Sequence, residues 1–236
     1  MATSQVFPLF PTAVGVYNFG QEYHEVNKSL VKDVFVEQKR DPQGHTRSNM
    51  GGWHGRMKME ERYDSFKTLR LQIEDCVNDY CRQTGHTDGL EIERLWANIN
   101  KKGDMNMGHH HGMSACTGVY YPINEIRKNG EEFYEYCDEV SLLPGSWDGK
   151  NGGSLCLQDP AYGQNIQLKF KQSLGNPSPY TLEFFHFYPV AGVLIVMPSY
   201  LIHHVTPFKD DKTRISISFV CKYGTDWVSY IKEPSS

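Results

Sequence analysis

The sequence predicts an α+β protein in which helices of the N-terminal portion pack against a barrel or sandwich of short strands. Apolar residues recur at helical spacing in about the first 90 residues, and after them short β-rich runs alternate with Gly, Pro, Asn and Asp. A chain of 236 residues can bury a single core. We therefore expect one domain over residues 1–236, with a helical portion of about 1–90 and a β-rich core of about 91–222.

The helical portion is expected to begin with a strand at residues 13–17, because β-branched residues there favour a pleated surface. Residues 21–38 have a helical pattern, and residues 60–82 carry an apolar stripe at steps of three and four, with Gly85 as a suitable end. The stripe consists of Phe66, Leu69, Ile73, Val77, Tyr80 and Cys81. Residues 41–55 are dense in turn formers, so we expect a loop there.

In the β-rich portion, six short runs have the composition of strands. They are residues 95–100, 117–121, 153–157, 166–170, 192–197 and 214–219.

Charge and hydropathy exclude two classes of partner. The formal net charge is −4, which gives no basic field for a nucleic acid. No apolar run approaches the roughly 20 residues that a membrane helix needs, so no membrane is expected. The six cysteines form no C-x-x-C pair, which is typical of reduced thiols in a cytoplasmic protein.

Three consecutive histidines precede the strand expected at residues 117–121. In an extended chain His109 and His111 share one face while His110 points away. Two imidazoles on one face can hold a metal ion. The alternative is a polar loop with solvated histidines.

Two later segments carry further polar groups of interest. His203 lies among apolar residues and, if it stood alone, would be interpreted as a buried core histidine. Eleven residues later, Arg214, Ser216 and Ser218 alternate with apolar residues, which indicates a strand. Its polar face points either into water or into a cavity, where the Arg fork and a hydroxyl would bind a carboxylate. No carboxylate lies on residues 192–197, which we expect to form the neighbouring strand.

Together these segments resemble the 2-oxoglutarate and Fe(II)-dependent oxygenases of marine phages and bacteria. The matching segments follow one another in the family's order nearly from end to end, and they are Leu9-Phe-Pro-Thr12, Ser48-Asn-Met-Gly-Gly-Trp53, Trp96-Ala-Asn-Ile-Asn100, Gly103-Asp-Met-Asn106 with His109-x-His111, Gly118-Val-Tyr-Tyr121, Gly152-Gly-Ser-Leu155 with Asp159-Pro160, Pro198-Ser-Tyr-Leu-x-His203 and Arg214-Ile-Ser-Ile-Ser-Phe219. The resemblance implies a double-stranded β-helix, that is, a jelly-roll barrel.

The resemblance also implies cofactors and residue roles. His109, His111 and His203 would ligate Fe(II), and Arg214 with Ser216 would bind the far carboxylate of 2-oxoglutarate. Further candidates for holding the keto acid are Asn98, Asn100 and Tyr121. The two asparagines could instead form a solvated strand face. Dioxygen would be the cosubstrate.

The histidine pattern departs from that of most 2-oxoglutarate oxygenases, which have H-x-Asp or H-x-Glu as the first pair. Because His111 is neutral where those enzymes have a carboxylate, the ligand set of the iron would carry one negative charge fewer. The identity of the second ligand therefore stays open. The register is also ambiguous, since His110-x-Gly112 resembles the pair of iron halogenases and His204 could replace His203. The spacing from Asn106 favours His109 and His111, and the family's Pro-Ser-Tyr-Leu-x-His pattern favours His203.

Two other classes remain as alternatives. One is a cupin-type enzyme with three histidines and no keto acid, and the other is a non-enzymatic jelly roll that binds a carbohydrate or a protein. Neither needs an Arg-x-Ser at residues 214–216. By analogy with other members of the superfamily, the substrate is a peptide or protein side chain such as proline, and loops 41–55 and 124–151 would select it. Loop 41–55 is either a lid or a plain connector.

Overall fold

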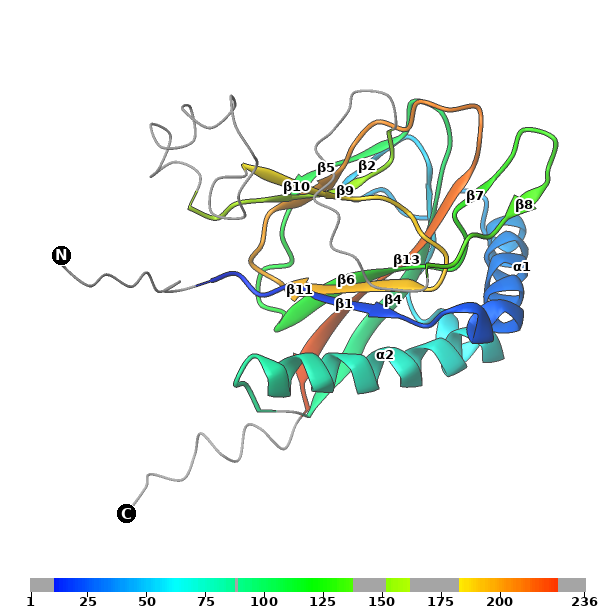
Figure 1. Cartoon of the computed structure of the whole chain (residues 1–236). Helices are drawn as coiled ribbons and strands as arrows, with labels where there is room; N and C mark the ends of the chain where they lie inside the picture. The colour runs from blue at the N-terminus through cyan, green and yellow to red at the C-terminus, as the bar shows by residue number, and fades with distance from the viewer. Residues whose placement is uncertain (1–10, 88, 138–151, 162–182, 225–236) are drawn as a thin grey trace, which may run out of the picture.

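The computed structural model describes residues 11–87, 89–137, 152–161 and 183–224, which form two facing antiparallel sheets and two helices (Figure 1). The larger sheet has the strand order β1-β11-β6-β13-β4-β3, and the smaller one has the order β10-β9-β12-β5-β2. The helices lie on the side of the larger sheet that faces away from the smaller sheet. This arrangement is a jelly-roll barrel with supporting helices, so the predicted α+β double-stranded β-helix is confirmed.

The strands are short except for two long neighbours, β4 and β13. The larger sheet contains β1 (Gly15–Asn18), β3 (Trp53–His54), β4 (Leu90–Asn100), β6 (Cys116–Tyr121), β11 (Val193–Pro198) and β13 (Arg214–Tyr223). The smaller sheet contains β2 (Asn49–Met50), β5 (Met105–His109), β9 (Leu155–Gln158), β10 (Phe184–Phe187) and β12 (His203–Val205). A separate hairpin pairs β7 (Glu125–Ile126) with β8 (Glu132–Phe133).

Both predicted helices are present. The first, α1, spans His24–Arg40 after the 3-10 turn η1 (Gln21–Tyr23), and the second, α2, spans Asp64–Gln83. The second helix begins later than expected because residues Met59–Glu61 form a separate 3-10 turn, η2, and Tyr63 is extended. The whole predicted stripe of α2 is buried. Beyond its end, Gly85 has a φ of 74° and the amide of His86 donates to the carbonyl of Cys81.

The described residues form two apolar clusters, one on each side of the larger sheet. The outer cluster joins the helices to Ile215, Ile217 and Phe219 of β13. The inner cluster fills part of the barrel and contains Val119, Tyr121, Leu155, Leu157, Val193, Ile195, Met197 and Leu201. Because side chains alternate along a strand, the polar face of β13 is turned toward the barrel interior. This alternation places Arg214 inside the molecule.

The expectation of a loop at residues 41–55 is partly wrong. Strand β2 pairs with β5, and β3 pairs with β4, so this segment adds an edge strand to each sheet. Two glycines with positive φ, Gly51 at 70° and Gly52 at 65°, turn the chain from one sheet to the other. Strands of two residues leave no alternation in the sequence, which is why the turn formers dominate the pattern.

Some expectations concern residues that the structure does not describe. The strand expected at 166–170, residues 138–151 of the expected loop 124–151, and residues 9–10 of the first matching segment lie outside the described residues. The expectation of a single domain over the whole chain stays a prediction. Among the described helices, none has both the length and the hydropathy that crossing a membrane requires.

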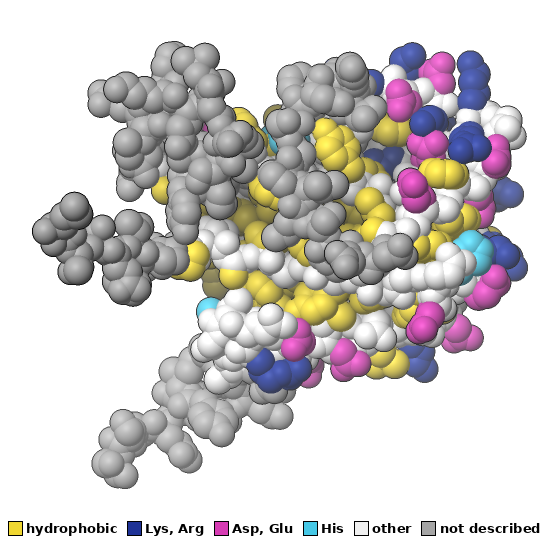
Figure 2. Space-filling view, viewed as in Figure 1, with side chains coloured by type: hydrophobic (Ala, Val, Ile, Leu, Met, Phe, Trp, Pro, Cys, Tyr) yellow, Lys and Arg dark blue, Asp and Glu magenta, His cyan; other side chains and the backbone are white. Residues whose placement is uncertain are grey.

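Charged side chains of both signs are interspersed on the face that Figure 2 shows, around α1 and the β7-β8 hairpin. The ion pairs of the β7-β8 hairpin include Arg127 with Glu131 and Lys212 with Glu125. This face therefore shows no extended patch of one sign, which agrees with the small net charge of −4.

Candidate active site

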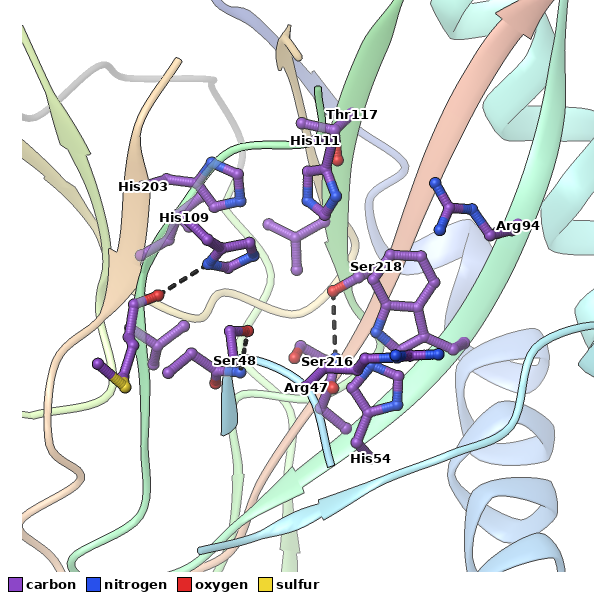
Figure 3. Close-up of a pocket in the computed structure, with 18 of the residues that line it drawn as sticks. Arg47, Ser48, His54, Arg94, His109, His111, Thr117, His203, Ser216 and Ser218 are labelled. Carbon is purple, nitrogen blue, oxygen red and sulfur yellow. Dashed lines mark hydrogen bonds between the residues drawn. The ribbon is translucent and has the colours of Figure 1, made fainter. Parts of the chain in front are cut away.

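A cavity of about 500 Å³ lies between the two sheets and is lined by side chains from both of them (Figure 3). Its polar lining includes three histidines that come from β5, the turn after it and β12. Arg214 and Ser216 of β13 and Asn98 of β4 face the same cavity. No Asp or Glu is among the described residues that line it.

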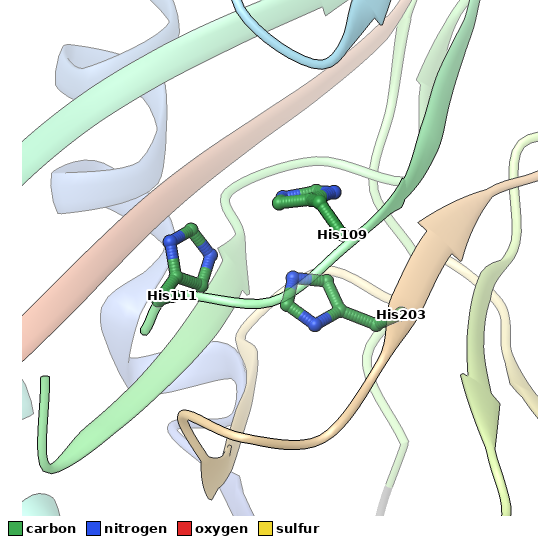
Figure 4. A group of neighbouring side chains, drawn as sticks. All are labelled: His109, His111 and His203. Carbon is green, nitrogen blue, oxygen red and sulfur yellow. The ribbon is translucent and has the colours of Figure 1, made fainter. Parts of the chain in front are cut away.

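The imidazoles of His109, His111 and His203 converge in this cavity (Figure 4). Each offers one nitrogen, and the three nitrogens all lie within 4.8 Å of one another. Strand β5 ends at His109, so His111 lies in the following turn, where its amide donates to the carbonyl of Ser199 at 2.9 Å. Three imidazole nitrogens gathered in this way could hold one metal ion.

Two of the histidines have the same local hydrogen bond. Nδ1 of His109 lies 2.8 Å from the carbonyl of Met107, and Nδ1 of His203 lies 2.8 Å from the carbonyl of Leu201. A carbonyl only accepts, so in each ring Nδ1 carries the proton and Nε2 keeps its lone pair. Such a bond fixes both the tautomer and the ring orientation of a metal ligand.

Burial also keeps these rings neutral. It lowers the pKa of His111 to about 3 and that of His203 to about 4, with a further contribution from the neighbouring imidazoles. The pKa of His109 is likewise lowered, mainly by burial. Neutral imidazoles are the form that coordinates a metal, so no proton has to leave near neutral pH.

The other two candidate histidines are turned elsewhere. His110 is exposed, and its Nδ1 accepts a hydrogen bond from the amide of Gly112 at 3.1 Å. His204 is paired across the sheet with Cys156, and its ring lies 6.0 Å from that of Phe184. The structure thus brings together the three histidines that the sequence favoured, and their role as ligands stays a prediction.

Arg214 is only 2% exposed and is held by neutral groups. One of its terminal nitrogens, Nη1, donates to Asn100 Oδ1 and to Ser216 Oγ, both at 3.0 Å, and Nη2 donates to the hydroxyl of Tyr121 at 3.2 Å. Its Nε has no hydrogen-bond partner, and no described carboxylate forms an ion pair with it. A buried cation without an anion is costly, so the site fits a ligand carboxylate.

The strand next to Arg214 differs from the one expected. The structure places β13 between β4 and β6, and β11 lies one strand further away, beside β6. Residues 192–197 are therefore not the neighbour of Arg214. Its direct cross-strand partner is Asn100, which supplies an amide oxygen instead of a carboxylate.

The predicted cofactor-binding residues also lie together. Ser216, Asn100 and Tyr121 contact the guanidinium of Arg214 directly. Asn98 lies opposite Ser216 in the pairing of β4 with β13, and its Nδ2 donates to Ser218 Oγ at 3.1 Å. The site thus contains three neutral nitrogen donors and an unneutralised arginine, a donor set that fits Fe(II) and a dicarboxylic keto acid.

Sequence reasoning did not assign several residues of the cavity wall to the site, and among them are Arg47, His54, Arg94 and Trp96. Arg94 and Trp96 precede Asn98 at steps of two, so the alternation along β4 was an available signal. Trp96 stacks on His54 with a centroid distance of 5.4 Å. His54 and Arg47 belong to segment 41–55, which was expected to help select the substrate, but no local pattern indicated which of its side chains reach the cavity.

A jelly roll that encloses three histidines and a buried arginine has the architecture of the non-haem iron oxygenases that use 2-oxoglutarate. A model of the 2OG-Fe(II) oxygenase family matches residues 94–220, more than half of the 236-residue chain. The chain therefore belongs to this family, whose members are enzymes that use Fe(II), 2-oxoglutarate and dioxygen.

Solved structures share the fold at low sequence identity. A prolyl-4-hydroxylase of Pseudomonas putida has a TM-score of 0.58 at 12% identity, with 90% of this chain and 94% of that chain covered. A prolyl hydroxylase of Trichoplax adhaerens, solved with a peptide of hypoxia inducible factor, has a TM-score of 0.54 at 13% identity and coverages of 94% and 87%. For a viral collagen prolyl hydroxylase of Paramecium Bursaria Chlorella virus-1, solved with 2-oxoglutarate, the TM-score is 0.52 at 11% identity, with coverages of 89% and 96%. No curated protein matches the chain in sequence.

Proposed function

We propose that the protein hydroxylates a side chain of a peptide or protein, such as a proline, and converts 2-oxoglutarate to succinate and carbon dioxide. One observation carries this proposal: three neutral imidazoles and a buried arginine without a carboxylate partner share one cavity. Bound Fe(II) and 2-oxoglutarate supply the activation of dioxygen, of which one oxygen atom enters the substrate and the other enters succinate. Every other step depends on the protein's own side chains.

His109, His111 and His203 hold Fe(II) in the proposed mechanism. Three histidine ligands would leave further coordination positions for the keto acid and dioxygen, and the bound metal would supply the activation of dioxygen. The ligand set carries no charge, because His111 stands where most related enzymes have a carboxylate. The pocket is therefore more positive than in those enzymes and favours anions.

Arg214 binds the far carboxylate of 2-oxoglutarate through its unpartnered Nε and its terminal nitrogens. Asn100 is a positioning residue, because its amide oxygen holds the guanidinium at 3.0 Å. The hydroxyls of Ser216 and Tyr121 lie beside the same guanidinium and can donate to the bound carboxylate. Asn98 lines the same cavity, opposite Ser216 in the pairing of β4 with β13, and would orient the keto acid.

The apolar part of the wall excludes water around the reacting groups. It includes Val119, Leu155 and Met197, together with the ring of Trp96. Removing water strengthens each charge interaction in the cavity and limits side reactions.

A peptide substrate is supported by the kind of enzyme that shares the fold. Three of the similar structures are prolyl hydroxylases, and one of them holds a peptide. A three-histidine cupin-type enzyme remains the second candidate, because the ligand set alone would suit it. The buried Arg214 counts against this candidate, since a reaction without a keto acid leaves that guanidinium without an anion.

The test is an anaerobic titration of the metal-free protein with Fe(II) and then 2-oxoglutarate. We expect a weak visible absorption band that needs both additions and, once air is admitted, slow formation of succinate and carbon dioxide. Protein treated with a chelator is the control. Absence of the band together with succinate formation no higher than in the control would contradict the proposal and favour the cupin-type alternative.

A further inference from the structure

The wall of the cavity carries two arginines that the proposed roles leave unused. Arg47 and Arg94 line the same cavity as the histidines, and both are more exposed than Arg214 (Figure 3). We infer that they form a binding site for a carboxylate of the primary substrate, so that the substrate is an acidic peptide. This inference rests on the proposed function and adds the charge of the substrate to it.

Arg94 lies near the metal site. It lines the same cavity as His111 and lies two residues before Trp96 on β4, whose ring is 6.1 Å from that of His111. Its side chain is 39% exposed, whereas Arg214 is only 2% exposed, so the two guanidinium groups lie at different depths. Arg214 is placed for the small cosubstrate, and Arg94 for a ligand that enters from the surface.

Arg47 lies on the wall of the same cavity beside His54. The pKa of His54 is lowered mainly by burial, and the nearby charge of Arg47 is a further cause. His54 stacks on Trp96, whose ring is 6.1 Å from that of His111. A flat surface of His54 and Trp96 thus connects Arg47 to the metal site.

Neither arginine is neutralised by an acidic group of the cavity. The described ion pairs include none for Arg47, and the one for Arg94 is a 3.5 Å contact with its chain neighbour Glu93, which is 41% exposed. Nε of Arg94 has no hydrogen-bond partner, and no Asp or Glu is among the described lining residues. A planar guanidinium fork binds carboxylates in a bidentate way, and a pair of them would favour an anion over a neutral group.

The net charge of the site with its cofactors bound also favours an acidic substrate. The charges of three neutral imidazoles, Fe(II) and the doubly negative keto acid sum to zero. The positive charge of Arg214 therefore remains without compensation. Arg47 and Arg94 add two more positive charges to the same cavity. A peptide with Asp or Glu close to the reacting residue would lower this excess, whereas a basic peptide would raise it.

The first experiment is an affinity selection with the protein loaded with 2-oxoglutarate and Mn(II), which replaces Fe(II) so that no turnover occurs. The probe is a synthetic library of peptides with a central proline and randomised flanks, and mass spectrometry identifies the peptides that are retained. We expect enrichment of Asp and Glu in the flanks relative to the starting library. Retention without this enrichment, or retention of no peptide, would overturn the inference.

The second experiment assigns the effect to the two arginines. A peptide that contains Glu and was enriched in the selection is compared by fluorescence polarisation with the same peptide carrying Gln instead. We expect the Glu peptide to bind at least about tenfold more tightly. This preference should disappear in Arg47→Gln and Arg94→Gln and should turn toward a Lys peptide in Arg94→Glu. The control is Arg127→Gln, because Arg127 is half-exposed on the β7-β8 hairpin and does not line the cavity.

The two proposals fail in different ways. If the preference for Glu is unchanged in both Arg→Gln variants, the inference is wrong even though 2-oxoglutarate is still bound and converted. If the parent protein binds no 2-oxoglutarate in the titration described above, the proposed function is wrong.

Discussion

His109 and His203 lie directly opposite each other in the antiparallel pairing of β5 with β12, and their ring centroids are 4.5 Å apart. Each ring is fixed by a bond from its own Nδ1 to the carbonyl two residues earlier in the chain. The two strands therefore place two oriented nitrogen donors on the inner face of the smaller sheet before any metal binds. The turn after β5 only has to bring His111 alongside them.

We expect alanine variants of His109, His111 and His203 to lose bound iron. Each substitution removes one of three nitrogen donors, and two imidazoles hold Fe(II) too weakly to survive desalting. Iron per protein is measured after anaerobic loading and gel filtration. His110→Ala and His204→Ala are matched controls, since neither ring belongs to the cluster, and equal iron loss from His110→Ala would contradict this ligand set.

We expect the affinity for 2-oxoglutarate to fall in the order parent, Arg214→Lys, Arg214→Met. Lysine keeps the positive charge but cannot make the bidentate contact of a guanidinium with a carboxylate, and methionine removes both the charge and this contact. A charge-assisted hydrogen bond contributes about 1.5–3 kcal/mol, so the methionine variant should bind the keto acid about 10- to 150-fold more weakly.

Iron binding should persist in both Arg214 variants, because Arg214 is not among the histidine cluster. The methionine variant should also stay folded, since an apolar side chain of similar length replaces a buried charge. Calorimetric titration with 2-oxoglutarate measures the affinity. Parent-like affinity in Arg214→Met would remove the main reason for proposing a keto-acid oxygenase.

The orientation of β13 could be predicted from the sequence because alternation is a local property. Ile215 and Ile217 belong to the cluster under the helices, and the intervening Ser216 lines the cavity. The same alternation along β4 places Asn98 and Trp96 on the cavity side. Wherever a strand is long enough to show a period of two, the sequence indicates which face is inside.

Other parts of the site depend on contacts between distant segments. His54 reaches the cavity because β3 pairs with β4, where its partner Asn98 lies 44 residues later in the chain. His111 was expected to share an extended face with His109, but β5 ends at His109. The bond from the amide of His111 to Ser199 holds the turn instead, and no local pattern reveals that partner.

We expect Gly118→Ala to destabilise the protein strongly. In β6, a Cβ at this position would collide with the carbonyl oxygen of Ile195 and would lie 2.5 Å from the ring of Phe219. Backbone and a buried aromatic ring cannot both move away, so we expect a loss of about 3 kcal/mol in the free energy of unfolding. Urea unfolding followed by tryptophan fluorescence measures it.

Gly108→Ala is the matched control for this substitution. A Cβ there would meet only Ile202, at 3.9 Å, which is an ordinary contact. The variant should unfold at nearly the same urea concentration as the parent. Equal stability of the Gly118→Ala and Gly108→Ala proteins would show that β6 is less tightly enclosed than the structure indicates.

The fourth prediction concerns Glu37, a fully buried carboxylate that joins α1 to the start of α2. It accepts hydrogen bonds from Arg40, from Arg62 at 2.9 Å and from the hydroxyl of Tyr63 at 2.9 Å. The bond to Arg40 is the main cause that lowers its pKa to about 2 from an ordinary 4.5, and burial opposes this lowering. A lowered folded-state pKa means that ionised Glu37 stabilises the folded protein above about pH 4.5 and stops doing so as the pH falls toward about 2.

Glu37→Gln should therefore lower the free energy of unfolding by about 2 kcal/mol near neutral pH. This value is smaller than the full pKa difference would imply, because Arg40 and Arg62 reach solvent, with 52% and 31% of their side chains exposed. Urea unfolding of the metal-free parent and variant at about pH 7 and about pH 3 measures the difference between their free energies of unfolding. We expect this difference to be smaller at the lower pH. Glu25→Gln on the same helix is the control, because that side chain is 81% exposed and its removal should matter little at either pH. A difference between parent and Glu37→Gln that stays constant with pH would show that packing, and not the charge of Glu37, holds the two helices together.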